Sequence, residues 1–564
     1  MQCQVRVVVF QSIVRQRLTA WLFAVSMLFC ASVASATPAA VAAPDRYGAD
    51  AAEEVLRAGG NAVDAAVATA FALAVTYPDA GNLGGGGFAT LYVGGKPYFL
   101  DYRERAPMRA TADMYLDAGG EVITEASTVG ARAAAVPGTV MGLWRMHRRF
   151  GRLPWRRDLA PALRFAKDGY TVSELQAGRS RSRAKELAGR TNFTDYYCLQ
   201  AGQQLRQPEL GVTLTRIARE GPNGFYRGRT AALIVAEMRR QGGLIDAQDL
   251  ASYRAVWREP LVAKWAEYSL VTAPPPSSGG IALIQLLKMR QAAAPMFAGV
   301  ALNSPQYVHL LAELEKRVFA DRAEYLGDPD YTSVPVASLI DESYLRERAG
   351  AISADEPSPT KAVGAGINAH HQTTHFSIVD RWGNAVSNTY TLNDDFGSGV
   401  VVRGAGFVLN NEMDDFSVKP GTPNIFGVVG GDANAIAPGK RPLSSMTPSL
   451  LLRDGRVELV IGTPGGSRIF TSVFQVVSNW HDFGLSLTDA VAAARVHHQL
   501  LPSQLIFQEP YAQLDAETVT ALRRRGYSFE QQDYNGDIQV IAVRGDQVTA
   551  VTDPRGVGVA RIVR

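Results

Sequence analysis

The hydrophobic and polar positions divide the chain into a mostly helical first part and a strand-rich second part. Residues 49–74 have helical character, interrupted by a Gly-Gly-Asn break at 59–61. After the break, residues 62–76 are almost all Ala, Val and Leu, which predicts a helix buried on every side. We also expect an apolar helix at 281–289 and a long amphipathic helix at 307–325.

The pattern changes at residue 372, where pleat-favouring residues begin to dominate. In residues 372–380, Phe376 and Ile378 alternate with polar side chains, as in a half-buried strand. A turn at 382–384 leads to a partner strand at 385–392. Because paired antiparallel strands bring the start of one beside the end of the other, we expect Thr373 to lie near Thr391.

The remaining segments extend the same pattern. Residues 173–270 are predicted to be mostly helical and polar, and helices are also predicted at 470–480 and 487–494. Further strands are predicted at 89–92, 97–101, 406–409, 449–452, 458–461, 506–508, 529–532, 539–543 and 547–551. Helices on both sides of a strand-rich middle indicate an α+β fold with sheets packed face to face between helical layers.

Three glycine- or proline-rich stretches mark the organisation of the chain. The glycine run at 81–87 lacks the Rossmann and P-loop spacings, so it indicates backbone packed too closely for side chains. Residues 274–280 resemble a linker in composition, but the apolar helix follows at once, which favours an ordered turn within one domain. Residues 357–366 have little periodicity and are expected to be a mobile segment.

Composition is typical of a soluble globular protein, with 46% hydrophobic and 20% charged residues in 564. The N-terminal residues 1–36 form a predicted signal peptide: two arginines precede an apolar run at 18–30, and small residues follow at 34–36. The run is short for a membrane span, so cleavage and export to the periplasm or medium are favoured over retention as an anchor. Removing the three leader arginines leaves no formal net charge, which gives no reason to expect a nucleic-acid partner.

Only one cysteine, Cys198, lies outside the leader, so no disulfide can form within the mature chain. It is expected to be a small buried hydrophobic residue.

Several blocks of sequence resemble the γ-glutamyltransferase family of N-terminal nucleophile hydrolases. The blocks are Gln-Thr-Thr-His at 372–375, Asn-Thr-Tyr-Thr-Leu-Asn at 388–393, and the segments 409–416, 440–448 and 462–468. The resemblance covers nearly everything after the leader. It implies a four-layer αββα sandwich, made as one chain and cut between Gln372 and Thr373. Residues 37–372 would form a large subunit and 373–564 a small catalytic subunit, both parts of one domain.

The implied chemistry depends on the new N-terminus. A threonine hydroxyl is a poor nucleophile without a base. A chain-terminal amine, with an ordinary pKa of about 7.7–8.0, supplies that base within the same residue. The hypothesis is that the Thr373 hydroxyl first attacks the Gln372 carbonyl and forms an ester that water opens. The resemblance assigns Thr391 to orienting Thr373, and the backbone N–H groups of Gly465 and Gly466 to the oxyanion.

The resemblance also implies a pocket for a free amino acid head group. From sequence alone Arg103 would be an ordinary surface ion-pair residue, but the family match assigns it to the substrate α-carboxylate, a natural role for a bidentate donor. The residues assigned with it are Ser444 and Ser445 for the carboxylate, and Asn393, Glu412 and Asp415 for the α-ammonium group. The implied reaction is transfer of a γ-glutamyl group from glutathione or a related amide to water, an amino acid or a peptide.

No metal or cofactor is expected, because adjacent histidines at 370–371 and 497–498 point to opposite faces of an extended chain and the cut separates His371 from His375. Two departures from the family pattern stand out. Phe426 occupies a position in the lid-like segment 420–431 where many members have Tyr, and Asp394-Asp395 adds two carboxylates near the site that could alter acceptor choice. Two alternatives remain: a cephalosporin or glutaryl amidase of the same superfamily, and a non-catalytic exported binding protein.

Overall fold

The computed structural model describes residues 37–363, 373–425, 427, 430–532 and 535–564. Residues 38–564 form one compact unit. Gln372, Phe426, His370, His371 and the predicted signal peptide lie outside the described residues. Within the described ranges, none of the helices has the length and apolar character needed to cross a membrane.

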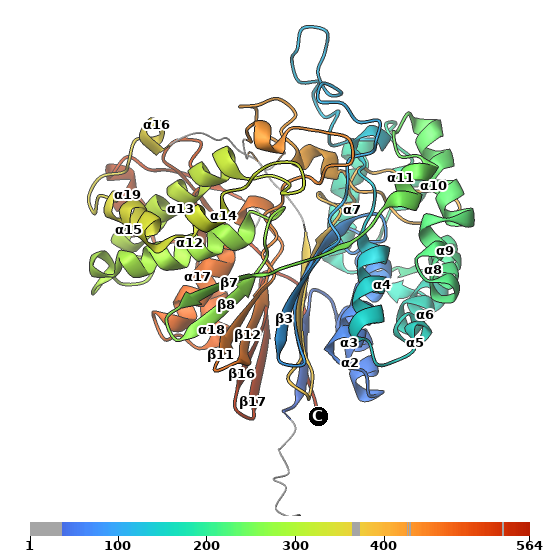
Figure 1. The fold of residues 1–564 in the computed structure, drawn as a ribbon, viewed down its shortest axis with the longest axis horizontal. Helices are drawn as coiled ribbons and strands as arrows, with labels where there is room; N and C mark the ends of the chain where they lie inside the picture. The colour runs from blue at the N-terminus through green and yellow to red at the C-terminus, as the bar shows by residue number, and fades with distance from the viewer. Residues whose placement is uncertain (1–36, 364–372, 426, 428–429, 533–534) are drawn as a thin grey trace, which may run out of the picture. The chain divides into compact units, whose positions relative to one another are not determined.

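Two antiparallel sheets form the centre of the unit (Figure 1). The seven-stranded sheet has the order β18 (Val559–Val563), β1 (Ala39–Ala43), β9 (Thr374–Val379), β10 (Ala385–Thr391), β2 (Gly86–Val93), β3 (Lys96–Asp101) and β6 (Val256–Arg258). The six-stranded sheet has the order β17 (Gln547–Thr552), β16 (Gln539–Arg544), β12 (Arg456–Gly462), β11 (Ser449–Arg453), β8 (Tyr268–Thr272) and β7 (Leu261–Trp265). Their facing sides share a buried apolar layer that includes Val379, Leu450 and Ile541.

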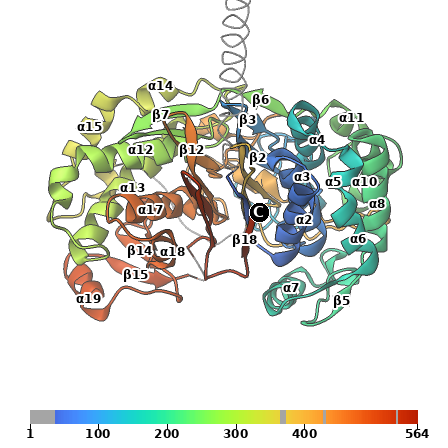
Figure 2. The same cartoon turned by 90° about the horizontal axis from the view of Figure 1, so that it is seen from below.

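Helices cover the outer face of each sheet (Figures 1 and 2). On the side of the seven-stranded sheet lie α2 (Arg46–Arg57), α3 (Ala62–Thr76), α4 (Thr139–Phe150), α5 (Trp155–Asp158), α6 (Ala160–Asp168), α7 (Glu174–Leu187), α8 (Pro208–Glu220), α9 (Asn223–Tyr226), α10 (Gly228–Gln241) and α11 (Ala247–Ser252). On the side of the six-stranded sheet lie α12 (Gly279–Ala292), α13 (Pro305–Tyr325), α14 (Val336–Leu339), α15 (Glu342–Gly350), α16 (Thr360–Val363), α17 (Ile469–His481), α18 (Leu487–Ala492) and α19 (Ala516–Arg524). The architecture is therefore the expected α+β sandwich of four layers, αββα.

Short elements complete the fold. The small sheets pair β4 (Tyr170–Thr171) with β5 (Gln204–Leu205), and join β13 (Val496–His497), β14 (Leu505–Gln508) and β15 (Ser528–Gln531). The 3₁₀ turns are η1 (Ala131–Ala133), η2 (Phe193–Asp195), η3 (Ala294–Phe297), η4 (Glu412–Asp415), η5 (Asp432–Asn434) and η6 (Gly466–Arg468).

Helix α3 has the predicted bounds and is buried along its whole length. Its N-terminus is fixed by a capping box, in which Asn61 and Asp64 each bond the other's backbone N–H. The glycine run that follows is packed as predicted. A side chain at Gly85 would place its Cβ 1.9 Å from the Thr391 carbonyl oxygen. The run therefore lets the chain pass directly against the end of β10.

Helix α13 also forms as predicted, but it is buried rather than amphipathic. Its charged side chains pair internally: the Lys316 ammonium lies 2.7 Å and the Arg317 guanidinium 2.9 Å from the Glu313 carboxylate, and all three side chains are buried. Charged residues therefore do not mark a solvent face on this helix.

Other predictions were wrong. Residues 256–272 form three strands rather than helix, and residues 406–409 form only isolated bridges because Gly84 and Val401 each pair with a single residue there. Cys198 is exposed, not buried. Strands β1 and β18 were not predicted. In β1, alternate residues face the helical core and the core between the sheets, so the strand is buried on both sides.

Candidate active site

The hairpin of β9 and β10 places the two threonines of interest at the same end of the seven-stranded sheet. In its register Tyr390 opposes Thr374, so the next pair along is Thr391 opposite Thr373. Both side chains are nearly inaccessible and both line one cavity. The short distance expected between the strand ends from the sequence pattern is present in the fold.

The cavity, counted together with the solvent space at its mouth, holds about 280 Å³ not filled by atoms. Its lining contains most of the residues that the sequence singled out: Arg103, Thr373, Thr391, Asn393, Asp415, Ser444, Ser445 and Gly466. Arg322, Met446 and Ile469 complete the lining. Two predicted residues do not line the cavity but adjoin residues that do: Gly465 precedes Gly466 in the chain, and Glu412 pairs with Arg103.

Arg103, two residues after the end of β3, is surrounded by carboxylates. Its guanidinium lies 2.5 Å from Glu412 and 3.5 Å from Glu104, and it also pairs with Asp415. Burial alone would lower the pKa of Arg103, but these carboxylates outweigh it and raise that pKa. Burial raises the pKa of Glu104 to about 8 against the opposing effect of Arg103, and raises the pKa of Glu412 and of Asp415.

Asn393 is fixed by backbone geometry at the end of β10. It has φ +82°, a left-handed conformation that Asn tolerates better than most residues. This bend lets the Asn393 backbone N–H donate to Thr391 Oγ1 at 2.8 Å. In the segment that the sequence marked as a lid, the Asn424 side chain donates to Asp415 at 3.2 Å. The described part of that segment therefore contacts the cavity wall.

Gly465 and Gly466 connect β12 to α17. Gly465 has φ +135°, which side-chain-bearing residues rarely adopt, and Gly466 opens the 3₁₀ turn that leads into the helix. The positive end of the α17 dipole therefore lies close to the cavity, where Ile469, the first residue of α17, also belongs to the lining. Backbone N–H groups at such a position suit a developing oxyanion.

Nearby titratable groups are engaged in structural contacts. Both ring nitrogens of His375 lie within hydrogen-bond distance of hydroxyls, those of Thr389 and Ser377. Complete burial lowers the pKa of His375 to about 3, so the ring is neutral. Asp394 lies 3.1 Å from Arg183 of α7, and Asp395 lies 3.9 Å from Arg179. These two departures from the family pattern therefore pair with arginines of helix α7.

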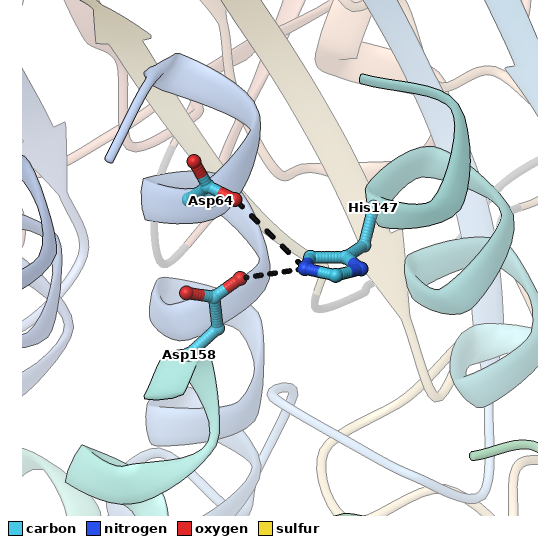
Figure 3. A group of neighbouring side chains, drawn as sticks. All are labelled: Asp64, His147 and Asp158. Carbon is cyan, nitrogen blue, oxygen red and sulfur yellow. Dashed lines mark ion pairs between the residues drawn. The ribbon is translucent and has the colours of Figure 1, made fainter. Parts of the chain in front are cut away.

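Asp64, His147 and Asp158 form a second cluster of titratable side chains (Figure 3). None of the three lines the cavity. One ligand atom from each lies within 4.8 Å of the others, a spacing that a metal ion could bridge. However, His147 Nε2 donates to the Leu153 carbonyl at 2.9 Å, and the Asp64 carboxylate accepts from the backbone N–H groups of Asn61, Arg152 and Leu153. Burial raises the pKa of Asp158 to about 9, so it holds a proton at neutral pH. These contacts fit a structural cluster.

Arg322 is the charged cavity residue that sequence reasoning missed. It belongs to α13, where charged residues are common and none stands out. Its spacing offered a signal: Leu311, Leu314 and Val318 form an apolar stripe on the helix, and residue 322 continues it at the next turn. A charge on a buried stripe requires a partner or a function.

A four-layer αββα sandwich with a threonine at the start of a central strand, facing a cavity, defines a threonine N-terminal nucleophile hydrolase. The sequence model of the gamma-glutamyltranspeptidase family matches residues 48–563, and the chain belongs to that family. It is 60% identical over 527 residues to the glutathione hydrolase proenzyme of Pseudomonas aeruginosa, covering 93% of this chain and 94% of that protein. It is 41% identical over 528 residues to the glutathione hydrolase proenzyme of Escherichia coli, covering 92% and 90%.

Solved structures agree with this assignment. The cephalosporin acylase from Bacillus halodurans is 28% identical with a TM-score of 0.80, covering 93% of this chain and 96% of that chain. A gamma-glutamyltranspeptidase chain from Pseudomonas nitroreducens, complexed with L-DON, is 56% identical with a TM-score of 0.57, covering 57% and 96%. The expected family and fold are confirmed.

Proposed function

We propose that this protein is a γ-glutamyltransferase and glutathione hydrolase that uses Thr373 as its nucleophile. The observation that carries the proposal is the composition of one cavity. It places the Thr373 side chain beside Arg103, Asp415 and two serines. A cation with hydroxyls suits a carboxylate, and a carboxylate suits an ammonium group. A free amino acid head group supplies both.

Maturation begins with the bond before Thr373. The Thr373 hydroxyl attacks the Gln372 carbonyl carbon, the peptide C–N bond breaks, and the Gln372 acyl group moves to the threonine oxygen as an ester. Water hydrolyses that ester, which leaves a carboxylate on residue 372 and a free amine on Thr373. Residues 37–372 and 373–564 become two subunits that stay associated, because strands of both regions are hydrogen-bonded side by side in the same two sheets.

The new amine then serves as the general base. It takes the proton of the Thr373 hydroxyl as the oxygen attacks the γ-carbonyl of the donor. The oxyanion is stabilised by the N–H groups of Gly465 and Gly466 at the start of the turn into α17. Thr391 orients the nucleophile from the opposite strand. The amine product leaves with the proton, and the γ-glutamyl ester remains on Thr373.

Water, an amino acid or a peptide next attacks the ester and releases the γ-glutamyl group, which regenerates the threonine. Arg103, Ser444 and Ser445 hold the donor carboxylate. Asn393, Glu412 and Asp415 hold its ammonium group, with Glu412 acting through its contact with Arg103. The steps as written require no metal and no cofactor.

A related amidase that takes glutaryl side chains is the main competing function, and the similarity to a cephalosporin acylase supports considering it. A glutaryl group lacks the α-ammonium, so it gains nothing from Asp415 and Asn393. The test compares γ-glutamyl and glutaryl p-nitroanilides as donors for the purified enzyme. We expect a strong preference for the γ-glutamyl donor that Asp415→Asn reduces. A preference for the glutaryl donor would establish the amidase, and turnover of neither would favour a binding protein.

The location follows from the leader. We propose that residues 1–36 are removed during export, so the mature large subunit begins near residue 37. N-terminal sequencing of the protein from the periplasm or medium tests this. The cytoplasm as its only location would contradict the proposal.

A further inference from the structure

Arg322 is a second cation in the catalytic cavity and has no assigned role. It projects from α13 and is nearly inaccessible to solvent. Its Nε donates to Ser278 Oγ at 3.1 Å, and its Nη2 donates to Ser445 Oγ at 3.4 Å. No hydrogen bond joins Nη1 to any residue within the described ranges. A guanidinium can therefore offer a further donor to a ligand in the cavity.

The charge environment of Arg322 differs from that of Arg103. Arg103 pairs with three carboxylates, whereas Arg322 forms no ion pair with any carboxylate of the described chain. Burial lowers the pKa of Arg322 to about 10, and Asp415 only partly opposes that effect from beyond ion-pair distance. Arg322 is thus protonated at neutral pH without a direct counter-charge. A buried cation in this state favours a ligand that brings an anion.

The hydrogen bonds around Arg322 also determine whether the hydroxyls of Ser444 and Ser445 act as donors or acceptors. Ser445 Oγ accepts from Arg322, and Ser444 Oγ accepts from the Met446 N–H at 3.1 Å. Ser278 links Arg322 to Ser444, because the Ser278 hydroxyl accepts from Arg322 and donates to the Ser444 carbonyl at 2.7 Å. With their oxygens accepting from the protein, both serine hydroxyls keep their protons as donors. Two O–H donors beside an unneutralised guanidinium form a site for a carboxylate.

We propose that Arg322 is a specificity-determining residue for the α-carboxylate of the donor: beside Arg103, whose charge is already balanced by carboxylates, it supplies a positive charge without a counter-charge, and it holds Ser445 as a hydroxyl donor. This inference rests on the proposed γ-glutamyl function. It predicts that Arg322 matters for donors that carry an α-carboxylate and matters little for those that lack it.

The test uses two donors that differ only in that group, γ-glutamyl p-nitroanilide and 4-aminobutyryl p-nitroanilide. For Arg322→Gln we expect KM for the γ-glutamyl donor to rise about 10- to 100-fold, because a charged hydrogen bond is lost equally in ground and transition states. We expect kcat to change by less than about threefold, and kcat/KM for the 4-aminobutyryl donor to change as little. Arg322→Lys keeps the charge and should restore most of the discrimination between donors.

Arg317→Gln is the matched control. Arg317 is buried on the same helix but pairs with Glu313, away from the cavity lining. We expect this variant to keep the wild-type ratio of kcat/KM for the two donors. Self-processing into two chains reports folding for each variant, and the Arg322→Lys comparison still decides the question if Arg322→Gln does not fold.

A double-mutant cycle with Ser445→Ala adds a readout that a merely structural role would not move. The effects of Arg322→Gln and Ser445→Ala on KM for the γ-glutamyl donor should be strongly non-additive. Equal losses on both donors, or lost discrimination in Arg317→Gln, would overturn the inference. If the wild type cleaves neither donor, the proposed function itself fails. If the wild type discriminates and Arg322→Gln discriminates equally well, only the inference fails.

Discussion

Replacing Arg103 by Gln should destabilise the protein in a way that depends on pH. The change removes the cation that lies between Glu412, Asp415 and Glu104, all of which are nearly buried. Removing one partner of a buried ion pair costs about 3–5 kcal/mol, because the remaining charge is left without compensation. We expect a loss of this size in the free energy of unfolding at pH 8.

The sign of the pH dependence follows from the carboxylates. Burial already raises their pKa values, with Glu104 at about 8, and Arg103 opposes that effect. Without Arg103 these pKa values rise further, so the folded variant binds more protons than the unfolded chain above about pH 4. Stability of the variant therefore falls as pH rises. At pH 5 the carboxyls are protonated, and the loss should shrink to about 1–3 kcal/mol, the cost of buried polar groups without partners.

Urea unfolding followed by tryptophan fluorescence at pH 5 and pH 8 measures this difference. Arg258→Gln serves as a control, because Arg258 pairs with Asp101 at 2.8 Å outside the cavity and Asp101 keeps a second partner, Arg441, at 3.3 Å. The control should lose less stability, with little change between the two pH values. A deficit in Arg103→Gln that is equal at both pH values, or larger at pH 5, would refute the reasoning.

Three further predictions follow from the site and its surroundings. Gly465→Ala should lower kcat about 100-fold or more with little change in KM, because φ +135° is strained for alanine and the oxyanion donors shift; steady-state kinetics of the processed enzyme measures it. Thr391→Val should slow both self-processing and turnover about 10-fold or more, since it removes the acceptor of the Asn393 N–H, whereas Thr391→Ser should retain both; gel analysis over time and an activity assay distinguish them. Asp158→Asn should raise the melting temperature at pH 8 but not at pH 4: burial raises the pKa of Asp158 to about 9, so the folded wild type holds a proton that the unfolded chain releases above about pH 4, and its stability falls as pH rises through that window. A gain for Asp158→Asn that is the same at both pH values would contradict this assignment.

The local pattern of apolar and polar residues was sufficient to predict helices and strands where that pattern is regular along a segment. The bounds of α3 follow from a run of small apolar residues after the Gly-Gly-Asn break, and the hairpin of β9 and β10 follows from alternation around a turn. Pattern failed for β1, whose five residues are Ala and Val. Alanine has low strand propensity, and the strand forms because it is paired on both edges and buried on both faces.

The sequence predicted those site residues that lie in segments resembling the γ-glutamyltransferase family. Blocks far apart in sequence meet in one cavity, as Arg103 and Ser444 do. These segments did not predict how the charges of the cavity residues are balanced. Arg103 proves to be enclosed by carboxylates, and the one sequence signal for Arg322 was its place on the apolar stripe of a helix with many charged residues. Cys198 shows the converse error: residue type alone favoured burial, but its local loop leaves it exposed.

The central claim is that Thr373 becomes a chain N-terminus and acts as the nucleophile. The most direct measurement is the denatured intact mass of the purified protein, beside that of Thr373→Ala. The account predicts two chains in the wild type, one of them beginning at Thr373, and a single uncut chain in the variant. A stable single chain in the wild type, or the same cleavage in Thr373→Ala, would contradict it.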